Sequence, residues 1–334
     1  MRLVYKKRKP VLQLAGFELG LDCFAGEKSV VTHAHSDHSS FASRPSEILA
    51  SQTTRELIVA RGGRAPAPAI DSLSLDSVHA ELFEAGHVLG SKQLYAEADG
   101  ASFVYTGDFN PVESLTTPSA GVRECDTLFM ECTYGRQEYS FPDRFAIYED
   151  LSGWVKQNQS EGAITVFGAY TLGKTQELVA CLNEYAGIAP VVTPAAKRFS
   201  DVYERNNIKQ DCIDNSSVEA ASELKGAFTA IVPSNKATVQ LAAVLQEHYC
   251  RPVRIAQATG WANNSSLAGA HRAFALSDHA DFNGLMDYAL STNAKTVYCT
   301  HGFSAEFAQS LRSKGINAVD CAALREGQRT LIMD

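Results

Sequence analysis

The sequence predicts an α/β fold in which short β-strands alternate with helices and loops. Apolar runs of strand length end at a glycine or a turn, as at residues 78–85 and 102–106. A helix pattern at residues 52–60 lies between strand patterns at residues 46–50 and 78–85. Several of the strand patterns end in a His, Asp or Glu side chain, and this repetition indicates that the strand ends converge on one site.

The composition excludes several broad classes of protein. A chain of 334 residues with 45% hydrophobic residues can form one large domain or two moderate ones. No apolar run approaches the ~20 residues that a membrane-spanning helix needs. The basic N-terminus is not followed by the apolar segment of a secretory signal. We therefore expect a soluble, cytoplasmic protein that makes no contact with a membrane.

Charge and cysteine usage give two further expectations. The eight cysteines are scattered and form no CxxC pair, which favours reduced thiols over a disulfide framework. The net charge of −8 does not suggest a nucleic-acid binder, although a local cationic lining can still bind phosphates. Residues 6–9 (KKRK) are the one dense basic run, either a solvated tail or a phosphate contact.

The segment HAHSDH at residues 33–38 places four metal-binding side chains within six residues, just after residues 28–31 (KSVV), which read as the end of a buried strand. If the segment is extended, His33 and His35 share a face and point to one centre. Asp37 and His38 follow where the chain turns, and can reach a second centre nearby. Imidazole and carboxylate ligands suit zinc and similar first-row ions.

Three later strand patterns end in comparable side chains. His87 is flanked by glycines in GHVLG, and Asp108 follows Gly107 in TGDF, where it could bridge two cations. Glu131 ends the apolar run at residues 128–131. Glycine beside such a residue allows the backbone to approach a bound ion closely.

In this order, HxHxDH, GHxLG and TGDF resemble the metallo-β-lactamase superfamily. The resemblance implies a four-layer αββα sandwich with the metal ions at one edge. Residues 11–14 and 17–22 alternate like two antiparallel strands around residues 15–16. Asp22, at the end of the second strand, matches an aspartate that orients a ligand histidine in this superfamily.

After ECTYG, roughly 120 residues at positions 139–256 precede the segment that carries the next histidine motifs, and they read as a small α/β unit. Within them, TLGKTQEL resembles a helix start of the β-CASP insertion, which marks the nuclease branch of the superfamily. Glycine before a helix can bind an anion, and Lys174 could add a phosphate contact. We expect a first metallo-β-lactamase segment at residues 1–138, the insertion at 139–256, and a return at 257–334.

The remaining β-CASP motifs complete the proposed site. ECTYG matches motif A with Glu131 as its acid, LSDHAD matches motif B with His279, and THGF matches motif C with His301. The resemblance implies two Zn²⁺ ions, with Mn²⁺ as an alternative, and a two-metal hydroxide attack on a phosphodiester. His279, oriented by Glu131, would be the general acid. One ion would be held by His33, His35, His87 and Asp108, and the other by Asp37, His38, Asp108 and His301. The expected catalytic residues are His279, Glu131, Asp37 and Asp22.

The resemblance implies a nuclease acting on single-stranded RNA or DNA. A histidine in motif C, as at His301, is typical of the RNA-processing branch, so RNA processing or decay is favoured. The alternative is a ligase-associated DNA exonuclease in repair, because LSDHAD and THGF also resemble that group. A small-molecule metallo-hydrolase and a non-catalytic scaffold subunit are further alternatives. A homodimer, and processing or ligase and helicase partners, would fit either nuclease, and the polarity of cleavage stays open.

Overall fold

The computed structural model describes residues 1–6, 8–14, 16–25, 28–62, 64–75, 77–263, 269–322 and 330–332. The chain forms two compact units. The first comprises residues 1–113, 117–138 and 279–334, and the second comprises residues 114–116 and 139–278. The first unit resumes at residue 279, and the expected boundary at residue 257 falls within Val253–Ala258, a strand of the second unit's sheet.

The first unit contains a seven-stranded sheet in the order β20-β1-β2-β3-β4-β5-β6. β1, β2 and β3 are antiparallel, and the strands from β3 to β6 run parallel. The two strands expected at residues 11–14 and 17–22 are present, with Leu14 opposite Phe17, while the expected turn residue Ala15 lies outside the described residues. The strands are β1 (Arg2–Lys6), β2 (Lys9–Leu14), β3 (Phe17–Leu21), β4 (Lys28–Val30), β5 (Glu47–Leu49), β6 (Ala69–Ile70) and β20 (Thr330–Ile332).

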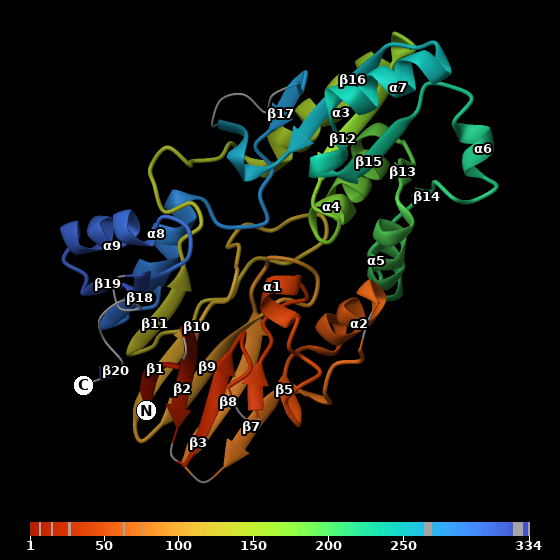
Figure 1. Ribbon diagram of the computed structural model, residues 1–334. Helices are drawn as coiled ribbons and strands as arrows, with labels where there is room; N and C mark the ends of the chain where they lie inside the picture. Colours follow the sequence, from red (N-terminus) through yellow and green to blue (C-terminus); the bar gives the residue numbers. More distant parts are fainter. Residues whose placement is uncertain are drawn as a thin grey trace. The chain divides into compact units, whose positions relative to one another are not determined.

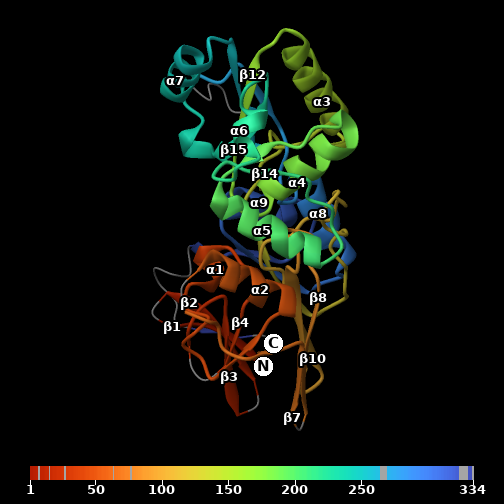
Figure 2. The ribbon, with the colours of Figure 1, turned by 90° about the vertical axis from the view of Figure 1, so that its right-hand side faces the viewer.

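A second seven-stranded sheet lies in the same unit, in the order β19-β18-β11-β10-β9-β8-β7. β7 to β10 are antiparallel neighbours, whereas β10, β11, β18 and β19 run parallel. Figure 2 shows β2, β3 and β4 in a different layer from β7, β8 and β10. The strands are β7 (Ser72–Leu75), β8 (Val78–Glu84), β9 (Lys92–Ala98), β10 (Ala101–Tyr105), β11 (Thr127–Glu131), β18 (Thr296–Thr300) and β19 (Ala318–Asp320).

The two sheets face each other across an apolar core, and helices cover their outer faces. Leu12, Leu19 and Val30 of the first sheet pack with Leu94 and Phe103 of the second. On the far side of the second sheet, α8 (Phe282–Ser291) and α9 (Ser304–Ser313) close another core, and Figure 1 shows them beside β18 and β11. The first sheet is flanked by α1 (Ser36–Ser39) and α2 (Gln52–Arg61). This arrangement confirms the αββα sandwich that the resemblance implied.

The second unit is a parallel six-stranded sheet with helices packed on it, as expected for a small α/β unit. The strand order is β14-β13-β15-β12-β16-β17. The strands are β12 (Ile164–Ala169), β13 (Val191–Val192), β14 (Ile213–Asp214), β15 (Thr229–Pro233), β16 (Val253–Ala258) and β17 (Arg272–Phe274). The helices are α3 (Arg144–Ser160), α4 (Lys174–Cys181), α5 (Pro194–Arg205), α6 (Ala220–Glu223) and α7 (Val239–Tyr249), with shorter helical turns at Leu182–Ala186, Ser234–Lys236 and Gly260–Asn263.

Lys174 at the start of α4 is not available to a phosphate, so that expectation is wrong. Its side chain is 3% exposed, and Nζ lies 2.8 Å from Oε2 of Glu177 and 2.6 Å from Oδ1 of Asp278. Arg144 makes a further short ion pair with Glu177. Burial would raise the pKa of Glu177, but the two cations lower it to about 2, so the carboxylate stays charged inside the unit. This cluster ties α3 and α4 to the end of the unit and is structural.

The basic run at residues 6–9 is not a tail. Lys6 and Lys9 lie opposite each other as the last and first residues of β1 and β2, and Arg8 lies in the turn between them, whereas Lys7 lies outside the described residues. All eight cysteines are free, as expected. In the described part of the chain, no helix combines the length and the apolar character that crossing a membrane requires.

Candidate metal centre and active site

The HxHxDH segment leaves the first sheet at the end of β4 and enters α1. The chain bends at His33 and His35 instead of continuing as a strand, but His35, the residue before α1, keeps the extended backbone angles expected (φ −61°, ψ 148°). The two imidazole rings converge, because Nε2 of His33 lies 3.1 Å from Nδ1 of His35. His38 lies within α1, so it projects from a different element.

Four of the predicted ligands form one tight group. The ligand atoms of His33, His35, His87 and Asp108 all lie within 4.8 Å of one another. Nδ1 of His35 is 3.1 Å from Nε2 of His87, and Oδ2 of Asp108 is 3.6 Å from His33 and 3.8 Å from His87. A tetrahedron with ligands ~2.0–2.1 Å from a central ion has edges of ~3.3 Å. The donor types and their spacing therefore fit a first-row divalent cation.

Two glycines allow the strands to deliver His87 and Asp108 to this group. Gly86 has φ +72°, and a Cβ there would lie 2.3 Å from the carbonyl oxygen of Asn110. Gly107 has φ +55°, and its Cβ would lie 2.6 Å from Thr32. A side chain at either position would displace the backbone that carries a ligand, which accounts for the glycines beside the motif residues.

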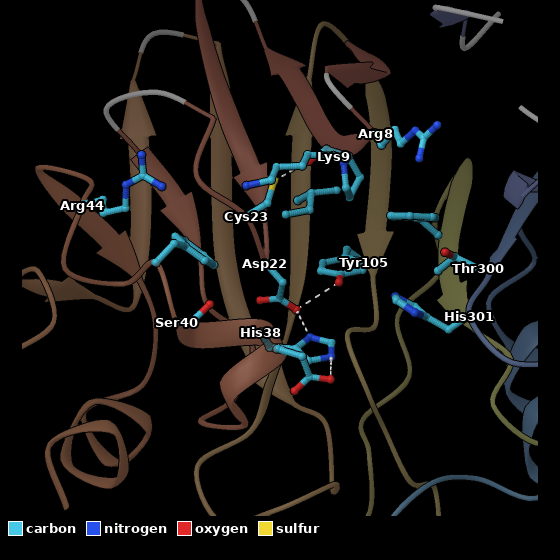
Figure 3. Close-up of a pocket in the computed structure, with 15 residues that line it drawn as sticks. Arg8, Lys9, Asp22, Cys23, His38, Ser40, Arg44, Tyr105, Thr300 and His301 are labelled. Atoms are coloured by element: carbon cyan, nitrogen blue, oxygen red, sulfur yellow. Dashed lines mark hydrogen bonds and ion pairs between the residues drawn. The ribbon is translucent and has the colours of Figure 1, made fainter. Parts of the chain in front are cut away.

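Asp22 holds His38 in a fixed orientation, as the resemblance implied. Oδ2 of Asp22 lies 2.7 Å from Nδ1 of His38 and accepts hydrogen bonds from Thr32 Oγ1 at 2.6 Å and from the Tyr105 hydroxyl at 3.0 Å. Figure 3 shows Tyr105 and His38 meeting at Asp22. With Nδ1 directed at Asp22, Nε2 of His38 lies 3.4 Å from Oδ2 of Asp108, which is the orientation of a ligand histidine supported by a carboxylate.

The electrostatics around these histidines favour a bound cation. Burial lowers the pKa of His33 well below its usual value, and the neighbouring imidazoles lower it further, so His33 is neutral as a ligand must be. Burial acts in the same direction on His38, but the charges of Asp108 and Asp22 outweigh it and raise its pKa to about 10. The carboxylates of Asp108 and Asp22 thus stabilise positive charge at this site, and a bound metal ion could carry that charge in place of the proton.

Asp37 and His301 lie further out. The side chain of Asp37 is 78% exposed, with Oδ2 3.7 Å from Nε2 of His38. His301 follows β18 with φ +61°, and its ring centroid lies 6.1 Å from that of His38. Among the described residues, neither joins a group of ligand atoms within 4.8 Å. The structure therefore does not bring the four members of the second predicted ligand set into one compact group, and that set is more open than the first.

Glu131 and His279 form a hydrogen-bonded pair beside the first ligand group. Nδ1 of His279 lies 2.7 Å from Oε1 of Glu131, whose side chain is 1% exposed. Glu131 also accepts hydrogen bonds from the backbone N–H groups of Phe109 and Thr133, both at 3.1 Å. Although burial would raise the pKa of Glu131, His279 and these donors lower it, so the carboxylate remains charged. Asp108, Glu131 and His279 themselves form a compact ligand group.

Sequence reasoning missed two residues of the site, Thr32 and Tyr105. Both hold Asp22, but Tyr105 comes from β10, 83 positions away, and nothing in its local sequence signals the contact. Three histidines outside the motifs have structural surroundings. His79 on β8 contacts Ser74 on β7 and Glu81 on its own strand. The N–H of Ile255 donates to Nδ1 of His271, and His248 packs on Tyr249.

Comparison with known proteins adds to this geometry. No family model matches the chain. A probable DNA ligase of Opitutus terrae is 29% identical over 88% of this chain and 29% of its own length. An RNase J-like protein of Methanocaldococcus jannaschii is 30% identical over 33% of this chain and 27% of its own length. The mouse DNA cross-link repair 1A protein is 29% identical over 45% of this chain and 16% of its own length.

The chain is a homologue of the β-CASP nucleases of the metallo-β-lactamase superfamily. It spans less than a third of the length of each of these three relatives. The two compact units match what a β-CASP protein requires, an αββα sandwich and an inserted α/β unit. The first ligand group and the Glu131–His279 pair both lie within the sandwich unit of this β-CASP homologue.

Proposed function

We propose that this protein is a metal-dependent nuclease that hydrolyses phosphodiester bonds in single-stranded nucleic acid. The observation that carries the proposal is that Asp108 belongs both to the four-donor group and to the compact group formed with Glu131 and His279. A cation site and a candidate proton donor therefore share one carboxylate. Hydrolysis of a phosphodiester needs both functions within reach of one phosphate.

The proposed cofactors are two Zn²⁺ ions, with Mn²⁺ as an alternative, because imidazole and carboxylate groups are suitable ligands for both metals. His33, His35, His87 and Asp108 would hold one ion, and Asp37, His38, Asp108 and His301 would hold the other. When bound, the ions supply positive charge that stabilises the transition state and lowers the pKa of water. Asp22 fixes the ring of His38 so that Nε2 is presented to the second ion.

His279 would protonate the leaving oxygen. Glu131 is buried and held by two backbone N–H groups, so it fixes the His279 ring through Nδ1 and stabilises its protonated form. The proton on Nε2 is the one that His279 would donate. A small-molecule hydrolase needs neither of these residues, and a scaffold subunit needs no intact ligand set, so their presence supports a nuclease.

Two separate observations bear on whether the substrate is RNA or DNA. His301 in motif C supports RNA, the substrate that the sequence favours. A DNA strand is a second candidate, because the relative matched over 88% of this chain is named a probable DNA ligase. A ligase would then be the natural repair partner. We also propose a cytoplasmic location, since eight free thiols fit a reducing compartment.

Radiolabelled single strands of RNA and DNA with matched sequence test the proposal. We expect the zinc-loaded chain to cleave at least one strand, a chelator to stop cleavage, and RNA to be cut faster. Faster cleavage of DNA would replace RNA by the repair alternative, and equal rates would remove the sugar preference. A protein that cuts neither strand while hydrolysing a small ester would overturn the nuclease assignment.

A further inference from the structure

A cavity of about 390 Å³ opens beside the second predicted ligand set. Asp37, His38 and His301 form one part of its lining, so the cavity is continuous with the candidate metal centre. Three basic side chains, those of Arg8, Lys9 and Arg44, form another part. Figure 3 shows Arg44 on the opposite side of the cavity from Arg8, with Asp22 and His38 between them.

The three basic residues carry charge that the described chain does not neutralise. Arg8, Lys9 and Arg44 form no salt bridge with another described residue, and Arg44 contacts the ring of Phe24 at 4.4 Å. Lys6, on the same hairpin, is instead bound to Glu18 at 2.5 Å. In a chain of net charge −8, three such cations around one cavity create a local positive potential that attracts anions.

The backbone of Arg8 strengthens this interpretation. Its φ of +67° is left-handed, a conformation that suits glycine and costs stability in any residue with a Cβ. Asp22 and His301, which line the same cavity, also have positive φ values. A positive φ is ordinary in a two-residue hairpin turn, but glycine or asparagine is the usual residue there, whereas this turn carries an arginine whose charge lines the cavity.

The rest of the lining is compatible with an organic anion. The carboxylate of Asp22 is occupied by Thr32, His38 and Tyr105. Burial raises the pKa of the Cys23 thiol to about 12, so that group is neutral. Phe41 and Phe129 add buried apolar surface. Cations together with an apolar wall are what a nucleoside phosphate requires, and the volume falls in the range of small-ligand pockets.

We propose that this cavity is a nucleotide-binding subsite, in which Arg8, Lys9 and Arg44 bind the phosphate of a nucleotide next to the cleaved bond. The proposal rests on the proposed nuclease function, because it places the strand beside the metal centre. It assigns two residues of the basic run, Arg8 and Lys9, whose role the sequence analysis left open, to substrate binding.

Calorimetric titration of the zinc-loaded full chain with adenosine 5′-phosphate, adenosine 3′-phosphate and adenosine tests the subsite. The variants are Arg8→Gly, Lys9→Ala and Arg44→Ala. Lys6→Ala is the matched control, because it removes the same charge from the same hairpin outside the cavity. Glycine adopts the backbone conformation of residue 8 freely, so Arg8→Gly should keep or raise the melting temperature.

We expect at least one monophosphate to bind more tightly than adenosine, and each of the three variants to weaken it by about tenfold, the loss of one charge-assisted hydrogen bond. Lys6→Ala should bind like the wild type. Whichever of the 5′- and 3′-phosphates binds more tightly shows which side of the cleaved bond occupies the cavity. Equal affinity in all three variants and the control would overturn the subsite.

Cleavage measured in parallel separates the two proposals. We expect the three variants to raise KM for the preferred strand. If the variants bind the monophosphate more weakly but keep an unchanged KM, the cavity does not bind the nucleic-acid strand. It would then bind the mononucleotide that cleavage releases. A wild type that cleaves strands, with binding independent of the three residues, refutes the subsite alone. Binding that depends on them in a protein that cuts neither strand refutes the nuclease function alone.

Discussion

Nδ1 of His279 lies 2.7 Å from Oε1 of Glu131, although 148 positions separate the two residues. Glu131 ends a central strand of the sandwich, and His279 comes just before α8. The N–H groups of Phe109 and Thr133 hold the carboxylate, and the His279 ring lies 4.5 Å from that of His87. A fixed carboxylate thus positions an imidazole at the edge of the candidate metal centre.

Replacing His279 by alanine is expected to slow cleavage by about 10²–10⁴-fold, the usual contribution of general acid catalysis. Metal content should be unchanged, because the four donors of the first group remain. Single-turnover cleavage and metal analysis measure the two effects. His79→Ala, a change at a half-exposed histidine on β8, is the control and should leave both unchanged. Wild-type turnover in His279→Ala would remove His279 from the mechanism.

Glu131→Gln is expected to shift the pH dependence of cleavage. The buried carboxylate stabilises the protonated imidazole, so its loss makes His279 give up its proton more readily. The alkaline limb of the pH–rate profile should therefore move to lower pH. A lower rate with an unmoved alkaline limb would indicate that Glu131 only supports the fold.

The stability of the metal-free protein is expected to fall as pH rises from 6.5 towards 10. Asp108 and Asp22 raise the pKa of His38 from 6.5 to about 10, so the folded state holds this proton more tightly than the unfolded state. The stabilisation is complete below pH 6.5 and is lost as pH rises through about 10. Melting temperatures of wild type and Asp22→Asn measure it, and the variant should show the shallower decline. Parallel curves would contradict the contribution of the Asp22–His38 pair.

Glu177→Gln should destabilise the second unit by about 3–5 kcal/mol, since it leaves the buried Lys174 and Arg144 without their shared counter-charge. Urea unfolding measures the change. Asp201→Asn breaks the exposed ion pair with Lys197 and should cost about 0.5 kcal/mol or less. Similar losses of unfolding free energy in both variants would show that the buried cluster contributes no more to stability than the ion pair of Asp201.

The motif residues could be predicted because their signal is local. Strand patterns that end in His87, Asp108 and Glu131 indicate a shared edge, and the order of the motifs gave the sandwich fold. The spacing within HxHxDH placed His33 and His35 together even though the segment does not continue as a strand. The two side chains remain neighbours because His35 keeps extended backbone angles although the chain bends there.

Other features depend on contacts that no local pattern encodes. Lys174 has the sequence context of an anion site, and only the packing of distant Asp278 shows that it is buried and paired. Tyr105 looks like any strand aromatic until the sandwich brings its hydroxyl to Asp22. Arg8 and Lys9 of the basic run line a cavity because β1 pairs with β2, which composition cannot show.

Metal analysis of the purified chain tests the central claim most directly, namely that His33, His35, His87 and Asp108 enclose a divalent cation. The wild type should carry about two transition-metal ions per chain, as a two-metal site requires. Asp108→Asn, which alters the carboxylate shared by both ligand sets, should lose most of this metal, whereas His79→Ala should keep it. A wild type without bound metal after zinc reconstitution, or equal metal content in Asp108→Asn, would contradict the account.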